Sequence, residues 1–251
     1  LVDALLLSAP IHSFPQLSRS PAFRRQWPSA YTAVEDGRQD REQLECYLAQ
    51  HLPKEGILVF PLDSTAWPHT DARTMADRQY VHSGSDTGLG APVVVAHPYS
   101  ILAWAPERNS SWAPPLSIRR VVSQKTDVQV GVEQVQQLCH HRRTKMLETF
   151  HLIVADGKYG NHSFLGPLKQ EPCGVLARMR CDRVLYRAPG KYSGKGRPRV
   201  HGKPFAFKEP ETWGEPQERV EVEDEKWGQV RLRRWDGLHA RQDADTVFSV
   251  V

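Results

Sequence analysis

The chain has 251 residues, a formal net charge of +4 and a hydrophobic content of 39%, so it is long enough for one large domain or for a core with a smaller appendage. No apolar run approaches the roughly 20 residues that a membrane-spanning helix needs, which excludes an integral membrane protein of that type. The mildly basic charge is compatible with nucleic-acid binding but does not single it out. Leu1–Pro10 has no basic leader and makes a poor signal peptide. The four cysteines show no CxxC spacing, so they favour a reducing cytoplasm over a disulfide framework.

Residues 1–55 are predicted to form a separate, helical segment with a possible DNA contact. Asp40–His51 begins like a capping box, and its side chains at positions 44, 47, 48 and 51 recur at helical spacing. Before it, Ser18–Pro28 interleaves arginines with aromatic residues, which suits contact with a DNA backbone. An alternative interpretation of the same stretch is a solvated surface with Phe23 and Trp27 docked on the core.

Two apolar runs dominate the middle of the chain, and each ends in an aspartate. They are Gly56–Trp67, with Asp63, and Phe150–Asn161, with Asp156. Each has the length and the bounding turn residues of a buried strand. Thr126–Met146 lies between them and is predicted to be a helix, with a capping box at its start and apolar residues at spacings of three and four. A strand, a helix and a strand in this order indicate two parallel strands of one sheet.

Parallel strands share their carboxyl-terminal edge, where ligands of open α/β sheets gather. If the two strands are neighbours, they lie roughly 4.8 Å apart, and Asp63 and Asp156 face one another across the strand ends. Two carboxylates so close repel each other unless a cation lies between them. The residues therefore predict a divalent-metal site.

The remaining strands are predicted with less regular patterns. Ala91–Pro106 is interpreted as two strands with a turn at His97–Ser100, so that the first three strands form an antiparallel meander. Pro61 removes a hydrogen-bond donor from the first apolar run and suggests a bulge. Gly174–Tyr186 alternates apolar and basic residues, as one half-buried strand would, and presents a basic edge. The members of this edge are Arg178, Arg180, Arg183 and Arg187.

Ala188–Gly214 holds the densest basic cluster, set among glycines and prolines, and is interpreted either as a flexible arm for phosphates or as an ordinary solvated loop. Its cations are Lys191, Lys195, Arg197, Arg199, Lys203 and Lys208. An acidic stretch, Val220–Lys226, and a basic alternating strand, Gly228–Trp235, follow. The last residues, Thr246–Val251, have the pattern of a strand interior, which suggests a truncated product.

Three motifs together resemble a DDE transposase of bacterial insertion sequences. They are LDSTAW around Asp63, RQYVHS at Arg78–Ser83 and IVADGKYGN around Asp156, and the likeness extends more loosely over most of the chain. The resemblance implies an RNase H-like α/β fold, a mixed sheet of three antiparallel and then two parallel strands flanked by helices. Residues 56–187 would form this catalytic core. Residues 188–251 would form a basic arm and a largely β insertion that is incomplete at the C-terminus.

The resemblance also implies a chemistry. Three acids would hold two Mg²⁺ ions, with Mn²⁺ as a substitute, for cleavage and strand transfer of double-stranded DNA at transposon ends and target; a homodimer is one expected assembly. Asp63 and Asp156 would be catalytic metal ligands. The third acid is a glutamate on a late helix in that family, and no convincing helix carries one here. The acids near the chain end are Glu218, Glu221, Glu223, Asp224, Glu225, Asp236, Asp243 and Asp245.

The residues predicted to contact DNA are Lys158, Arg178, Arg180, Lys191, Lys195, Arg197, Arg199 and Lys203. Two other functions stay open: a non-catalytic DNA-binding remnant without the third acid, and a hydrolase of another phosphoester on a similar sheet. The histidines form no zinc spacing, and no serine lies in a nucleophile-elbow context.

Overall fold

The computed structural model describes residues 2–8, 12–69, 71–72, 74–82, 93–106, 113–143, 148–192, 194 and 196–251. The chain divides into two compact units, Leu1–Leu44 and Glu45–Val251. Within the described ranges, no helix is long and apolar enough to cross a membrane. The predicted segment boundaries at residues 55 and 187 stay predictions.

The first unit is helical, as predicted. It contains α1 (Val2–Leu6), α2 (Phe14–Leu17) and α3 (Pro28–Glu35). The edge of Phe14 meets the ring of Tyr31 with centroids 4.7 Å apart, which ties α2 to α3. Trp27 also contacts Tyr31 but is 48% exposed, so it packs within this unit and keeps half of its surface in solvent.

Helix α4 (Arg41–Gln50) begins with the predicted cap, since the Gln43 N–H donates to Asp40 Oδ1 at 3.0 Å. The helical spacing of residues 44, 47, 48 and 51 does not mark one buried face, although Leu48 packs against the core. Tyr47 is 58% exposed, whereas Glu45 is buried at 7% exposure. A charged side chain can face inward here because Arg119 pairs with it at 2.5 Å and the Ser117 hydroxyl donates to it at 2.6 Å.

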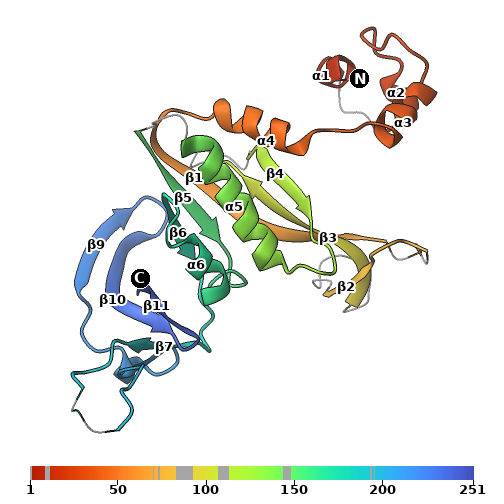
Figure 1. The fold of residues 1–251 in the computed structure, drawn as a ribbon. Coiled ribbons are helices and arrows are strands. Elements are labelled where there is room, and N and C mark those ends of the chain that lie inside the picture. Colours follow the sequence, from red (N-terminus) through yellow and green to blue (C-terminus); the bar gives the residue numbers. More distant parts are fainter. Residues whose placement is uncertain are drawn as a thin grey trace. The chain divides into compact units, whose positions relative to one another are not determined.

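The main sheet contains β1 (Glu55–Pro68), β2 (Gln79–His82), β3 (Val93–Ala103), β4 (Pro115–Arg120), β5 (Glu148–Ala155) and β6 (Cys173–Ala177). Its order is β2-β3-β1-β5-β6, and β4 also pairs with β3. β3 is antiparallel to β1 and β4, while β5 is parallel to β1 and to β6. Three antiparallel strands followed by two parallel ones confirm the predicted RNase H-like arrangement (Figure 1).

Two local predictions in this sheet are wrong. No turn interrupts β3 at His97–Ser100; the strand runs through, with alternate residues buried on one face. Pro98 fits because it pairs with Ala66 while its carbonyl accepts from the Val121 N–H at 2.9 Å. Pro61 produces no bulge either, since β1 stays in register with β5 through the Pro61–Val154 pair.

Helix α5 (Asp127–Arg143) covers one face of the sheet (Figure 1). Its predicted capping box is present: Gln129 Oε1 accepts from the Thr126 N–H at 2.8 Å, and Thr126 Oγ1 accepts from the Gln129 N–H at 3.2 Å. The predicted apolar face enters the main core, which is built on Phe60, Leu62, Val135, Leu138, Ile153, Tyr159 and Phe164. A side chain at Gly131 would approach Leu62 and Tyr159 to 3.0 Å, so this glycine lets the helix lie close to the end of β1.

A second sheet follows the core, as the predicted β insertion requires. It contains β7 (Val184–Arg187), β8 (Pro204–Ala206), β9 (Glu218–Asp224), β10 (Gly228–Ala240) and β11 (Asp243–Val250), in the order β11-β10-β7-β8 with β9 on β10. The predicted single strand Gly174–Tyr186 is wrong. Its ends belong to β6 and β7, in different sheets, because a turn closed by Arg183 N–H donating to the Arg180 carbonyl lies between them.

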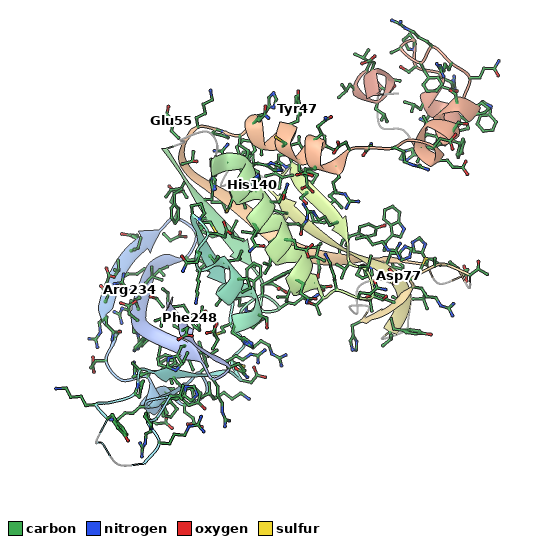
Figure 2. All side chains as sticks on the ribbon, in the orientation of Figure 1. Tyr47, Glu55, Asp77, His140, Arg234 and Phe248 are labelled. Atoms are coloured by element: carbon green, nitrogen blue, oxygen red, sulfur yellow. The ribbon has the colours of Figure 1, made fainter. Side chains whose placement is uncertain are left out.

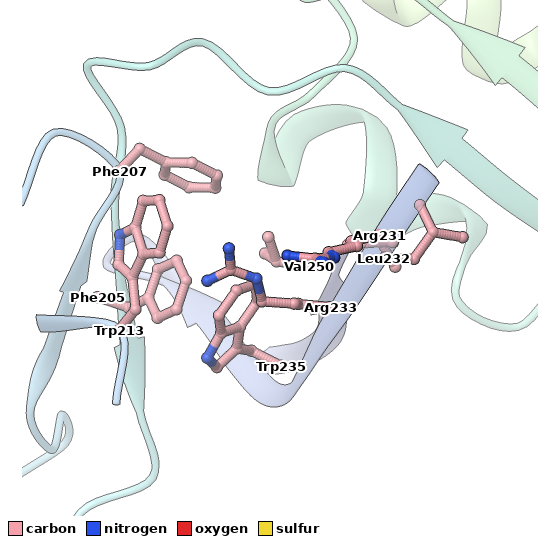
Figure 3. A pocket seen from close by; sticks show the side chains of 9 residues that line it. Phe205, Phe207, Trp213, Arg231, Leu232, Arg233, Trp235 and Val250 are labelled. Carbon is pink, nitrogen blue, oxygen red and sulfur yellow. The ribbon is translucent and has the colours of Figure 1, made fainter. Parts of the chain in front are cut away.

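The second sheet has a small aromatic core, around a groove of about 410 Å³ (Figure 3). Phe205 stacks on Trp213, and both meet the edge of Trp235. Both indole N–H groups donate to backbone carbonyls, Trp213 to Ala206 and Trp235 to Gly214. Among the residues that the structure describes, no acid lines this groove, so it is not a candidate for carboxylate chemistry.

Candidate active site and nucleic-acid interface

Asp63 and Asp156 lie where the parallel pairing of β1 and β5 ends. The last parallel pair between β1 and β5 is Leu62 with Ala155, and each aspartate is the next residue along its strand. Beyond this point β1 continues along β3, with Asp63 opposite Ile101, while β5 ends. The two acids, 93 positions apart in the printed sequence, therefore reach one edge of the sheet, which we call the rim.

Each rim carboxylate is held by a backbone N–H of a residue that closely follows it in the chain. Asp63 Oδ1 accepts from the Ser64 N–H at 2.7 Å, and Asp156 Oδ1 accepts from the Lys158 N–H at 2.9 Å. Both side chains are exposed. Within the described residues, neither carboxylate has an ion-pair partner, and its second oxygen accepts no hydrogen bond. One oxygen of each acid thus orients the group while the other faces outward.

This donor set suits a hard cation such as Mg²⁺, which prefers carboxylate oxygen and keeps several waters. The resemblance to DDE transposases implies three acids, and the rim has two. No group of three or more His, Cys, Asp or Glu in the described ranges could hold a metal. Three of the late acids are paired elsewhere: Glu218 and Asp236 pair with Arg234, and Glu221 pairs with Arg231 (Arg234 is labelled in Figure 2). A hydrogen bond from Thr246 holds the pKa of Asp243 below its usual range.

A third acid that the sequence interpretation missed lies beside the rim. Asp127, the first residue of α5, has its Oδ2 2.5 Å from Lys158 Nζ and accepts from the Ser64 hydroxyl at 3.0 Å. Lys158 Nζ also donates to Ser64 Oγ at 2.7 Å. An acid in the first turn of a helix is ordinarily explained by the helix dipole, so the sequence alone gave no reason to single it out.

Tyr159 lies beneath this network with no measurable exposure. Burial first, and then the charges of Asp127 and Asp63, raise the pKa of its phenol to about 12, although the neighbouring hydroxyls of Ser100 and Ser64 lower it. Among the described residues its oxygen has no hydrogen-bond partner of good geometry. Tyr159 is therefore neutral at physiological pH and serves as a wall of the core rather than as an acid or base.

An open groove of about 910 Å³ runs from Asp156 along the turn that joins the two sheets. We call it the basic groove; its lining includes Asp156, Lys158, Arg178, Arg180, Arg183 and Lys208. The structure thus brings Lys158, Arg178 and Arg180, three of the predicted DNA contacts, next to a rim carboxylate. Arg187, assigned to the same basic edge from sequence, does not join them. Its guanidinium donates to the Trp213 carbonyl and lies 5.7 Å from the Phe205 ring centroid.

The basic segment Ala188–Gly214, predicted as an arm for phosphates, places only one of its described cations in the basic groove. Of its cations, Lys208 lines the basic groove. The other described members are exposed and make no side-chain ion pair within the described ranges: Lys191, Arg197, Arg199 and Lys203. Lys195 lies outside the described residues. Part of the arm is ordered, because β8 and a short 3-10 turn, Pro210–Thr212, lie within it.

The RQYVHS motif forms β2 and its approach, with Ser83 outside the described residues. Gln79 donates to the Val121 carbonyl at 2.6 Å, and Asp77 pairs with Arg120 at 2.8 Å (Asp77 is labelled in Figure 2). A hydrogen bond from Ser123 holds the pKa of Asp77 below its ordinary value. These contacts fasten the start of β2 to the end of β4, so the motif has a structural role within the described residues.

Comparison with known proteins identifies a family for the chain. The model of the DDE superfamily endonuclease family matches residues 1–241. No curated protein matches. Solved structures that resemble the chain include the Mos1 strand transfer complex, at 12% identity and a TM-score of 0.27 over 71% of this chain and 57% of that one. A pre-cleavage Mos1 transpososome resembles it at 11% identity and a TM-score of 0.27, over 71% and 58%. The chain therefore spans less than two thirds of those chains, and by its family match it belongs to the DDE superfamily endonucleases.

Proposed function

We propose that this protein cleaves DNA phosphodiester bonds and transfers DNA strands as a transposase, with Asp63 and Asp156 as its metal-holding acids. The observation that carries the proposal is the parallel register of β1 and β5, which brings these two acids to one rim beside the basic groove. Carboxylates with one oxygen oriented by the backbone and the other open match the ligands of a divalent cation bound with water. Mg²⁺ is the ion we expect, with Mn²⁺ as its substitute.

Each part of the site would act on DNA in its own way. The cations of the basic groove would bind backbone phosphates and fix the duplex in register with the rim, a contact that carries no sequence information. Asp63 and Asp156 would hold the divalent cations that activate a water or a DNA 3′-hydroxyl and stabilise the leaving oxygen. The backbone N–H groups of Ser64, in β1, and of Lys158, in the turn after β5, would keep both carboxylates oriented before DNA arrives.

The test is a nicking assay on supercoiled DNA in Mg²⁺ or Mn²⁺. We expect nicking or joining of the DNA, and we expect a chelator to abolish it. Asp63→Asn or Asp156→Asn should lower the rate by a factor of about 10³ or more, since each removes a charge at the reacting phosphate. Glu133→Gln, which removes an exposed carboxylate of α5 outside the site, is the matched control. Full activity of both aspartate variants would reject the assignment.

A second candidate function is DNA binding without cleavage. It is favoured by one observation, that no group of three metal ligands occurs in the described part of the chain. It predicts binding whose affinity falls steeply with salt, as phosphate contacts require, and no cleavage in either metal. Metal-dependent cleavage by the 251-residue chain would dismiss this alternative. Turnover of a small phosphoester with no effect on DNA would point to a third class, a hydrolase of another phosphoester.

A further inference from the structure

The ammonium of Lys158 joins the two strand ends that carry the rim acids. Ser64 directly follows Asp63, and Lys158 follows Asp156 by two residues. Lys158 Nζ contacts Ser64 Oγ at 2.7 Å and Asp127 Oδ2 at 2.5 Å, and Ser64 in turn donates to Asp127 at 3.0 Å. The three side chains form a closed triangle of hydrogen bonds, and three different elements of the fold converge on it.

Stability does not explain this triangle. The side chains of Lys158 and Asp127 are 46% and 24% exposed, and ion pairs in contact with solvent contribute little because water screens them and the long side chains lose freedom. The triangle does fix one thing, the position of a positive charge beside the rim. A lysine ammonium has three donors, and Ser64 and Asp127 use two of them, so one donor is left to point elsewhere.

We propose that Asp127, with Ser64, is a positioning residue that holds the Lys158 ammonium at the rim for a phosphate oxygen of the DNA strand being cut. This inference rests on the proposed function. The charge of Asp127 is needed because divalent cations held by Asp63 and Asp156 would repel a nearby ammonium. The Asp127 carboxylate paired with Lys158 would offset that repulsion, and the basic groove that includes Asp156 and Lys158 would lead the DNA backbone to this point.

The rival explanation is that Asp127 is itself the third metal ligand. The oxygen it presents to the rim is already occupied by Lys158 and Ser64, and the three aspartates do not form a metal-sized group among the described residues. The two explanations differ in the group through which Asp127 affects DNA cleavage. A positioning residue acts through Lys158 alone, whereas a ligand acts through metal affinity whether or not Lys158 is present.

The first experiment measures position without activity. Modification of Lys158 by an amine-reactive reagent is followed by peptide mass spectrometry in the wild type, Asp127→Asn and Glu133→Gln. We expect the ion pair to protect Lys158 in the wild type and in Glu133→Gln, which removes a carboxylate of the same helix from an exposed pair with Lys125. In Asp127→Asn the rate should rise by several-fold. Equal rates in all three proteins would overturn the proposal.

The second experiment measures single-turnover DNA cleavage in Mg²⁺, DNA affinity in Ca²⁺ and Mn²⁺ affinity by calorimetry. We expect Lys158→Met to slow cleavage by about 100-fold and Asp127→Asn by about 10- to 100-fold, since misplaced donors lose effects of this size. The double variant should be no slower than Lys158→Met, because both changes remove one interaction. Mn²⁺ affinity should stay within about threefold of the wild type in all three variants, whereas the DNA affinity of Lys158→Met should fall because one phosphate contact is lost.

Two outcomes separate this inference from the function on which it rests. Weakened Mn²⁺ binding in Asp127→Asn, or additive losses in the double variant, would make Asp127 a ligand and overturn the positioning role. A wild type that modifies as expected but cleaves no DNA would reject the proposed function, while the protection of Lys158 would still establish the positioning. In that case an unchanged salt dependence of DNA binding in Lys158→Met would reject its phosphate contact.

Discussion

The two glycines of the ADGKYGN motif differ in what surrounds them, and this difference predicts opposite effects of alanine. A Cβ at Gly160 would lie 2.3 Å from the Arg178 carbonyl oxygen, about 0.7 Å inside the 3.0 Å below which such contacts essentially never occur. A Cβ at Gly157 would lie 3.6 Å from Arg180 Cγ and 3.8 Å from the Arg178 carbonyl oxygen, which is ordinary contact. Neither glycine has a positive φ, so alanine meets no backbone strain at either position.

The backbone of Arg178 cannot retreat freely, because its N–H donates to the Ala155 carbonyl at 3.0 Å, directly before Asp156. Forced overpacking costs about 1–3 kcal/mol, and a lost backbone hydrogen bond costs about 1 kcal/mol. Replacing glycine also restricts the unfolded chain, which stabilises the fold by about 0.4–1 kcal/mol. We therefore expect Gly160→Ala to lower the free energy of unfolding by about 2 kcal/mol and Gly157→Ala to raise it by about 0.5 kcal/mol.

Urea unfolding followed by tryptophan fluorescence measures both values, and a DNA-binding titration shows whether Arg178 has moved within the basic groove. Gly160→Ala should weaken DNA binding, because the displaced backbone belongs to that groove. Gly157→Ala is the control, since it adds the same methyl group three residues away in the same turn. Equal stability of the two variants would refute the reasoning, as it would mean that the Arg178 backbone yields without resistance.

Three further predictions concern stability and DNA binding. Burial, and then the charge of Arg142, lower the pKa of His151 to about 4. The contribution of His151 to the free energy of unfolding is therefore fully present above the unfolded pKa of about 6.5 and is lost as pH falls from there towards 4, by about 2 kcal/mol between pH 7 and pH 5. His151→Gln should remove this pH dependence in urea unfolding. Arg178→Gln and Arg180→Gln should each reduce the salt slope of DNA binding by roughly one, whereas Lys54→Gln, an exposed cation outside the basic groove, should leave it unchanged. Asn161→Ala should cost about 1 kcal/mol, because its side chain caps α6 (His162–Leu168), and a serine at that position should recover most of it.

Most of the fold could be predicted from the sequence because the strongest sequence signals are local. The apolar runs that end at Asp63 and Asp156 predicted two parallel strands, and the register between β1 and β5 has both acids at one edge. Thr126 and Gln129 predicted the start of α5, since a capping box is complete within four residues. Such patterns depend on neighbouring residues along the chain, so they can be recognised without knowledge of the rest of the structure.

The errors arose where distant partners decide the local structure. Glu45 faces the interior only because Arg119 and Ser117, far along the chain, satisfy its carboxylate. The alternation of Gly174–Tyr186 continues across a turn, and nothing within the segment shows that its two ends join different sheets. Asp127 was missed for the same reason. Its partners lie 63 and 31 positions away, so no spacing rule could connect them.

The charge at the rim makes a last prediction. Asp63, Asp127 and Asp156 set three carboxylates against the one ammonium of Lys158, so these four side chains carry a formal net charge of −2. Like charges at adjacent strand ends oppose folding unless a cation joins them. A divalent cation that binds only the folded state should stabilise it by about 1.4 kcal/mol at ten times its Kd, seen as a rise in Tm with Ca²⁺ or Mg²⁺.

Asp63→Asn should behave oppositely in two respects. Its Tm without metal should equal or exceed that of the wild type, because one repelling charge is gone, and the rise with metal should disappear. Glu133→Gln should keep the full rise, since its carboxylate lies on α5 in an exposed pair with Lys125. A rise that survives in Asp63→Asn would show that the metal binds elsewhere, and the two aspartates would then be neighbours by topology without a shared chemistry.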